Sequence, residues 1–132
     1  MLCLILLFAG AVKYEDFHHV KYVRTIDGDT IVVDIPGEKK LFGYHREVRL
    51  AGIDTPERHD KRFRVRFLAY YAKNVVRQRL ERAKRIDLVD TGREKYDRIL
   101  ARVIVDGQDI CALLLRRKLA HPYGGGTKNN NW

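Results

Sequence analysis

The sequence contains little cysteine, and what it has is not clustered. Only two cysteines occur among the 132 residues, Cys3 and Cys111. No Cys-x-x-Cys pair and no cluster of cysteine with histidine is present, which argues against a structural zinc site and against a disulfide scaffold. Cys111 stands among apolar residues in a predicted helix, so we expect it to be a core residue rather than a nucleophile.

The sequence also lacks an apolar run long enough to cross a membrane. The segment MLCLILLFAGAV, residues 1–12, is shorter than the roughly 20 residues that a spanning helix needs. Its length suits the apolar core of a secretory signal, and Ala9-Gly10-Ala11 resembles a cleavage site, although no basic residue precedes it. We therefore expect residues 1–15 to be a signal-peptide remnant or an apolar N-terminal segment. No stable membrane insertion is expected, and a secreted or periplasmic location is favoured over a cytoplasmic one.

No internal repeat, low-complexity tract or linker divides the chain. Its length suffices for one core, so we expect one domain over residues 16–123, a flexible tail over residues 124–132, and a monomer. The 26 lysines and arginines exceed the 17 acidic residues, which gives a net charge of +9. Such a charge attracts polyanions, most often nucleic acid, although a basic surface that only aids solubility is the alternative.

The hydrophobic pattern predicts an α+β fold. Alternating apolar residues and turn signals predict five strands, at residues 19–26, 30–35, 47–53, 85–90 and 99–106. A period of three to four residues predicts a helix over residues 62–82, and Asp109 is expected to cap a second helix over residues 110–117. A closed five-stranded barrel with helices packed on it is the simplest way to leave no sheet edge exposed. The polar face of the long helix is compatible with a solvated surface or with a nucleic-acid contact, and it carries Arg66, Lys73, Arg77 and Arg82.

Two acidic clusters stand where a predicted strand meets a turn. The first is Asp27-Gly28-Asp29-Thr30, in which Asp-Gly suits a tight hairpin because glycine tolerates positive φ. The second is Asp54-Thr55-Pro56-Glu57, in which the proline restrains the backbone. Each cluster alone is compatible with a plain turn. Together, carboxylates at strand ends could converge on a hard cation such as calcium, which prefers oxygen ligands.

Two arginines supply the complementary charge. Arg49 lies on the strand that ends at Asp54, and Arg98 opens a later strand. A guanidinium group binds two phosphate oxygens at once and stabilises the charge that builds up in phosphoryl transfer. Acids that hold a cation and activate water, together with such arginines, are what metal-assisted phosphodiester hydrolysis requires. No Ser/His/Asp or Cys/His arrangement indicates a covalent nucleophile.

Four segments of the chain closely resemble the staphylococcal nuclease (thermonuclease) family in their order and spacing. They are IDGDT (26–30), VRLAGIDTPE (48–57), EKYDRILARV (94–103) and LLLRRKLAHPY (113–123). The resemblance runs from about Val23 to Tyr123. It implies an OB-type five-stranded β-barrel with two to three packed helices. It also implies a calcium-dependent endonuclease that cleaves DNA and RNA with low sequence specificity and leaves 3′-phosphate ends.

The resemblance also implies a role for individual residues. The implied calcium ligands are the carboxylates of Asp29 and Asp54 and the backbone carbonyl of Thr55. Glu57 corresponds to the residue that orients or deprotonates the attacking water. The remaining positions correspond to phosphate-binding arginines, Arg49 and Arg98, and to nucleotide-binding residues, Lys95, Tyr96 and Tyr123.

The sequence departs from the family pattern at two positions. Asp97, next to Arg98, and Lys118 stand where the family often has glycine. The alternative function is a non-catalytic nucleic-acid or protein-binding OB-fold module, as in the repeated domains of Tudor staphylococcal nuclease proteins, which keep the barrel but lose catalytic acids. The presence of all the acids and arginines named above favours the enzyme.

Overall fold

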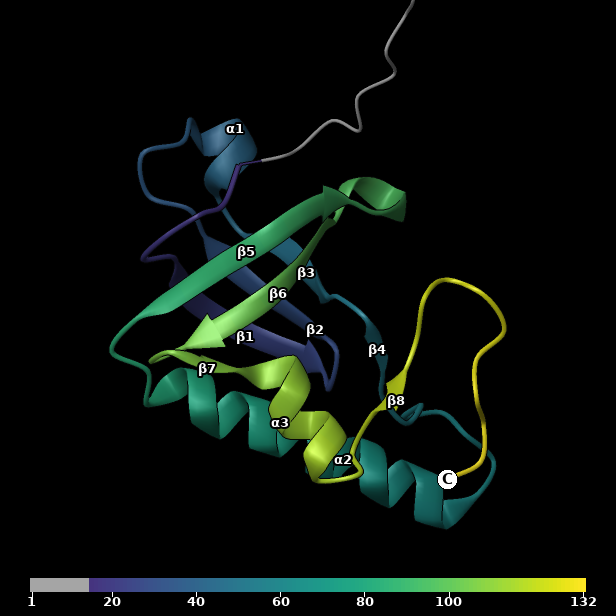
Figure 1. Ribbon diagram of the computed structural model, residues 1–132. Coiled ribbons are helices and arrows are strands. Elements are labelled where there is room, and N and C mark those ends of the chain that lie inside the picture. Colours follow the sequence, from purple (N-terminus) through teal and green to yellow (C-terminus); the bar gives the residue numbers. More distant parts are fainter. Residues whose placement is uncertain (1–14) are drawn as a thin grey trace, which may run out of the picture.

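The computed structural model describes residues 15–132, so nearly all of the predicted signal remnant lies outside the described residues. One mixed, curled sheet has the strand order β1-β2-β3-β6-β5 (Figure 1). Its strands are β1 (Lys21–Asp27), β2 (Thr30–Asp34), β3 (Arg46–Leu50), β5 (Ile86–Arg93) and β6 (Ile99–Val105). The two-residue strand β7 (Gln108–Asp109) pairs with β6 in an antiparallel manner, and β4 (Ile53–Asp54) pairs with β8 (His121–Pro122).

Three helices accompany the sheet: α1 (Lys40–Gly43), α2 (Phe63–Glu81) and α3 (Ile110–Arg116). A short 3-10 turn, η1 (Lys95–Asp97), joins β5 to β6. The long helix α2 passes across one end of the sheet, and α3 lies between it and β6 (Figure 1). Within residues 15–132, no helix is both long and apolar enough to cross a membrane. The predicted α+β fold of OB type is confirmed.

The chain just before β1 joins the two edges of the curled sheet. Phe17 and Leu88 exchange backbone hydrogen bonds of 2.9 and 2.7 Å, and the amide of Val20 donates to the carbonyl of Ile86 at 2.9 Å. Because Leu88 and Ile86 belong to β5, the first and last strands of the sheet are connected in this way. Part of the backbone of the edge strand β5 is therefore paired inside the molecule.

The sequence pattern that predicted the two main helices is confirmed in the structure. The apolar stripe of α2 is buried: Val65, Ala69, Ala72, Val75, Val76 and Leu80. The side chain of Asp109 caps α3, because it accepts hydrogen bonds from the amides of Cys111 and Ala112 at 2.8 and 3.4 Å. Such a cap satisfies amides that have no partner inside the helix. Cys111 is buried, as expected of a core residue.

The predicted strand over residues 47–53 is wrong in one respect that matters for function. The strand ends at Leu50, and Gly52 has a φ of +77°, which only glycine adopts without strain. The chain therefore turns, and Ile53–Asp54 forms the separate strand β4 against β8. Arg49, near the end of β3, is only 7% exposed.

Candidate active site

One cavity of about 300 Å³ brings the two acidic clusters together with both predicted arginines. It lies where the β1–β2 turn meets the end of β3 and the segment after β4. The lining residues are Asp27, Asp29, Thr30, Arg49, Thr55, Pro56, Glu57, Arg58, His59, Arg98 and Lys128. Asp54 reaches the same group through ion pairs with Arg49 and Lys128. Six of the nine residues predicted for the site therefore meet here.

The two acidic clusters are held against each other by direct contact. The amide of Thr55 donates a hydrogen bond to Asp29 Oδ2 at 3.1 Å. A Cβ atom at Gly28 would lie 2.9 Å from Thr55 Oγ1 and 3.0 Å from Ala72 Cβ. The backbone φ of Gly28 is not positive. Glycine is therefore needed here for the close approach of β4 and α2, and the expectation that it supplies a left-handed turn is wrong.

Arg49 pairs with both buried carboxylates of the site. Its Nη2 lies 3.3 Å from Asp29 Oδ2 and 3.6 Å from Asp54 Oδ1. Its Nη1 donates to the carbonyl of Leu50 at 3.0 Å. Asp29 is 8% exposed and Asp54 is 2% exposed. Two buried carboxylates at one place require compensating positive charge, and this arginine supplies part of it.

The pKa values of the first cluster reflect this arrangement. Burial opposes ionisation of Asp29, but the positive charge of Arg49 and the hydrogen bonds at its carboxylate outweigh it, so the pKa of Asp29 is lowered. Burial and the neighbouring negative charge of Asp29 raise the pKa of Asp27 to about 6. Asp29 is therefore the member of the pair that ionises at the lower pH, and an ionised carboxylate is the state required of a cation ligand.

The oxygen atoms around Asp54 fit a hard cation. Asp54 Oδ1 is buried and makes no hydrogen bond of acceptable geometry, although the charged groups of Lys128 and Arg49 lie 3.1 and 3.6 Å from it. A buried carboxylate oxygen without a hydrogen bond is a position that a cation can satisfy. Within residues 15–132, no three acidic, histidine or cysteine side chains converge closely enough to hold a metal ion alone. A cation here would need backbone carbonyl and water oxygens beside the carboxylates, as the predicted ligand set of Asp29, Asp54 and Thr55 includes.

Lys128 is a member of the site that the sequence did not indicate. Its Nζ lies 3.1 Å from Asp54 Oδ1 and 3.0 Å from Glu57 Oε1. Burial opposes the charged form, but the contacts with the carboxylates of Glu57 and Asp54 outweigh it and raise the pKa of Lys128. The residue belongs to a glycine- and asparagine-rich segment with no periodicity, so only the folded chain brings it to these acids.

Arg98 lies at the edge of the cavity, next to the turn η1. Its Nε pairs with Glu94 Oε2 at 2.8 Å. Lys95 and Tyr96 precede it in η1 but do not line the cavity, and Tyr96 is 90% exposed. The predicted Lys95 and Tyr96 positions are therefore placed beside the arginine but outside the cavity. Both Tyr96 and Asp97 have left-handed backbone, with φ values of 62° and 60°.

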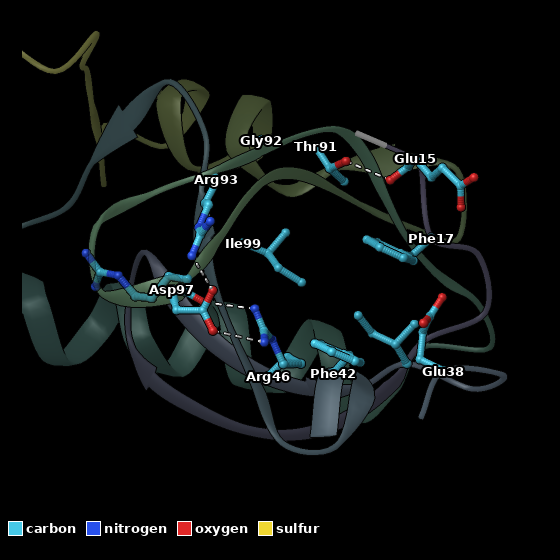
Figure 2. A pocket seen from close by; sticks show the side chains of 12 residues that line it. Glu15, Phe17, Glu38, Phe42, Arg46, Thr91, Gly92, Arg93, Asp97 and Ile99 are labelled. Carbon is cyan, nitrogen blue, oxygen red and sulfur yellow. Dashed lines mark hydrogen bonds and ion pairs between the residues drawn. The ribbon is translucent and has the colours of Figure 1, made fainter. Parts of the chain in front are cut away.

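Asp97 is turned toward a neighbouring cavity of about 560 Å³ (Figure 2). Its carboxylate lies 3.3 Å from Arg46 Nη1 and 3.4 Å from Arg93 Nη2. Figure 2 shows these three side chains at one end of the cavity and Phe17 and Phe42 farther along it. Arg46 and Arg93 thus compensate the Asp97 charge. Arg98 is not one of these partners, although it lines both cavities.

The neighbouring cavity differs from the site in its charge balance. Three acids and three arginines line it together with apolar side chains. The smaller cavity is lined by three acids and four arginines or lysines, and two of these cations, Arg49 and Lys128, contact buried carboxylates. Convergence of buried charge, rather than size, is what marks a site for chemistry.

The remaining predicted positions lie around the site. The amide of Tyr123 donates to the carbonyl of Gly52 at 2.9 Å, and the Lys128 ammonium lies 5.9 Å from the Tyr123 ring centroid. Tyr123 is thus adjacent to Lys128 but does not line the cavity. Lys118 has a φ of 56°, so the family's frequent glycine there has a conformational reason. Asp27, Arg58 and His59 line the cavity and were not predicted as site residues, although each adjoins one of the acidic motifs.

The fold and this cavity define an α+β protein of OB type with carboxylates and guanidinium groups gathered at its strand ends. The sequence model of the family described as "Staphylococcal nuclease homologue" matches residues 47–131. This range is more than half of the chain, so the protein belongs to the staphylococcal nuclease family, and the resemblance seen in the sequence is confirmed. Comparison with curated proteins finds no match. The matched range contains Arg49, Asp54 and Glu57, whereas the structure itself adds Asp29 from the preceding segment.

Proposed function

We propose that this protein is a calcium-dependent endonuclease. It hydrolyses phosphodiester bonds of DNA and RNA with low sequence specificity and leaves 3′-phosphate ends. The observation that supports this most is the convergence of Asp29 and Asp54 with Arg49, beside a buried Asp54 oxygen that lacks a hydrogen bond. Membership in a family that contains nucleases supports it as well. The basic net charge of +9 favours a polyanionic substrate.

In this proposal, the chain supplies ligands, phosphate contacts and a base. Asp29, Asp54 and the Thr55 carbonyl would hold the calcium ion, which polarises the phosphate when bound. Arg98 presents its terminal guanidinium nitrogens to the phosphate, since the ion pair with Glu94 uses Nε. Arg49, already beside both carboxylates, stabilises the negative charge that develops on the phosphorane oxygens.

Glu57 is the base that takes a proton from the attacking water. Its side chain is 58% exposed, so water reaches it. It follows the rigid Pro56 and shares the Lys128 ammonium with Asp54, which places its carboxylate next to the proposed cation ligands. Lys128 must move away from Glu57 Oε1, which it contacts at 3.0 Å, before that oxygen can bind the attacking water.

Plasmid cleavage with calcium and with chelator tests the proposal. We expect degradation of plasmid DNA in calcium and intact DNA in chelator. Glu57→Gln should reduce turnover by about 100-fold or more while DNA affinity changes little, because it removes a base and not a phosphate contact. Glu47→Gln, an exposed acid on β3, is the matched control and should cleave normally. Equal losses of turnover and affinity in Glu57→Gln would assign Glu57 to binding.

A non-catalytic nucleic-acid-binding module is the alternative function. The observation that favours it is the Lys128 ammonium, which already compensates Asp54 and Glu57. Intact plasmid in both calcium and chelator, together with retained DNA binding, would establish this alternative.

A further inference from the structure

A second surface of the molecule combines exposed aromatic rings with positive charge. It is a groove of about 870 Å³ between the first half of α2, the segment that follows α3, and the chain end. We call it the α2–α3 groove. Figure 1 shows the chain end next to the start of α2. The groove residues used below are Arg64, Phe67, Tyr71, Arg117, Lys118 and Trp132.

The aromatic side chains of this groove are partly exposed to solvent. Phe67 is 59% exposed and Tyr71 is 49% exposed, although both belong to a helix with a well-buried opposite side. Trp132 stacks on His121 with ring centroids 3.8 Å apart and 22° between their planes. Large exposed aromatic surface is unfavourable in water unless a partner covers it. Stacking on aromatic faces is how proteins bind unpaired nucleic-acid bases.

The charge of the groove identifies the partner as an anion. Arg64, Arg117 and Lys118 line it, and no acid is among its lining residues within the described chain. A smaller adjoining groove of about 290 Å³ shares Tyr71 and Arg117. It adds Arg79 and Arg82, while its single acid, Asp106, accepts hydrogen bonds from the backbone amides of residues 84 and 85.

The groove starts beside the candidate active site. In the β4–β8 pair, Asp54 lies opposite His121, and His121 is the residue on which Trp132 stacks. The β4–β8 pair therefore connects the two surfaces, because Asp54 belongs to the candidate site and His121 lines the groove. Two cations of the helix face that the sequence suggested have partners elsewhere: Arg66 donates to the carbonyls of Asp60 and Lys61 at 2.9 and 2.8 Å, and Arg77 pairs with Glu81.

We infer that the α2–α3 groove binds single-stranded nucleic acid adjoining the strand position that is cleaved. The bases stack on Tyr71, Phe67 and the Trp132–His121 pair, and the phosphates lie along Arg64, Arg117 and Arg82. This inference rests on the proposed function for the identity of the ligand, and it adds a preference for unpaired strands. A duplex keeps its bases stacked inside, so it cannot use the aromatic faces.

Binding of a fluorescein-labelled dT12 oligonucleotide in chelator, followed by anisotropy, tests the inference without any cleavage. Tyr71→Ala should weaken binding about tenfold, within the range known for loss of one base–aromatic contact. Tyr70→Ala is the matched control, because Tyr70 is 67% exposed on the same helix but does not line the groove. A duplex of the same length should bind more weakly and should not distinguish the two variants.

Arginine variants give a second readout that does not depend on helix packing. Arg117→Ala should reduce the slope of log affinity against log salt by about 0.7, the value for one contact with a single strand. Arg116→Ala should leave the slope unchanged, because Arg116 is exposed on α3 but does not line either groove. Equal behaviour within both matched pairs would overturn the inference.

Two further outcomes separate this inference from other interpretations. If the wild type sediments as a dimer that Tyr71→Ala dissociates without changing oligonucleotide binding, the groove is an interface between copies and the inference fails. If calcium produces no cleavage but the Tyr71 and Tyr70 variants differ in binding, the inference stands and the proposed function fails. If calcium produces cleavage but the Tyr71 and Tyr70 variants bind the oligonucleotide equally, the proposed function stands and the inference fails.

Discussion

Replacing Lys128 by methionine tests how the tail lysine affects the proposed calcium site. Methionine keeps an unbranched apolar stem beside Tyr123 and removes only the charge. The Lys128 ammonium contacts Glu57 at 3.0 Å and Asp54 at 3.1 Å, and its own side chain is 42% exposed. An exposed pair such as the first contributes less than about 1 kcal/mol. The second involves a buried carboxylate and contributes about 1 kcal/mol after screening by solvent.

A calcium ion that binds Asp54 must displace the Lys128 ammonium from Asp54 and Glu57. The variant should therefore bind calcium with an affinity higher by about 5–30-fold, which corresponds to about 1–2 kcal/mol. Isothermal titration calorimetry measures this directly. In chelator, the variant should unfold several degrees below the wild type, and saturating calcium should remove that difference, because binding to the native state stabilises it by mass action. Lys84→Met, an exposed lysine at the other end of α2, is the control.

An unchanged or weaker calcium affinity in Lys128→Met would refute this reasoning. A weaker affinity would mean that the ammonium holds Asp54 and Glu57 in place for the cation rather than competing with it. Absence of calcium binding in both proteins would instead contradict the proposed cofactor. The calorimetric result and the thermal result must agree, since both report the same linkage.

Two further predictions concern the packing around the site. Gly28→Ala places a methyl group about 3 Å from two neighbouring side chains. It should therefore lower the free energy of unfolding, measured in urea, by about 1–3 kcal/mol and weaken calcium binding. The control is Gly92→Ala, whose methyl group would lie 4.0 Å from its nearest neighbour, and it should change stability by less than about 0.5 kcal/mol. Burial raises the pKa of Cys111 to about 12, so in a Cys3→Ser background Ellman's reagent at pH 8 should react only after unfolding. Rapid labelling of the native protein would contradict the burial. Because the pKa of Cys111 is higher in the folded than in the unfolded protein, ionisation of the thiol favours the unfolded state, and stability should fall as the pH rises above about 9.

The local elements of this fold could be predicted because their signals are local. The apolar stripe of α2 repeats every three to four residues, and Asp109 precedes α3 as a cap should. Both depend on neighbours within one or two turns of helix. The short elements β4, β7, β8 and η1 were not predicted, since two or three residues carry no measurable period.

The site was predictable in composition but not in its connections. Asp29, Arg49, Asp54 and Glu57 stand in motifs that the sequence displays, and the structure places them at one cavity. Whether Lys95, Tyr96 and Tyr123 contact a nucleotide stays a prediction. The motifs could not show that Arg49 is buried between two carboxylates, because that depends on strands far apart in the chain.

By itself, the sequence determined the α+β class, the basic charge, the family and the acidic and arginine residues of the candidate site. Each follows from composition, periodicity or a short motif. Only the tertiary structure decided that Lys128 reaches Asp54 and Glu57, that Asp97 pairs with Arg46 and Arg93, and that aromatic rings and arginines share the α2–α3 groove. These relations join residues that are distant in sequence, and they depend on the packing of separate elements, for which no segment alone carries a signal.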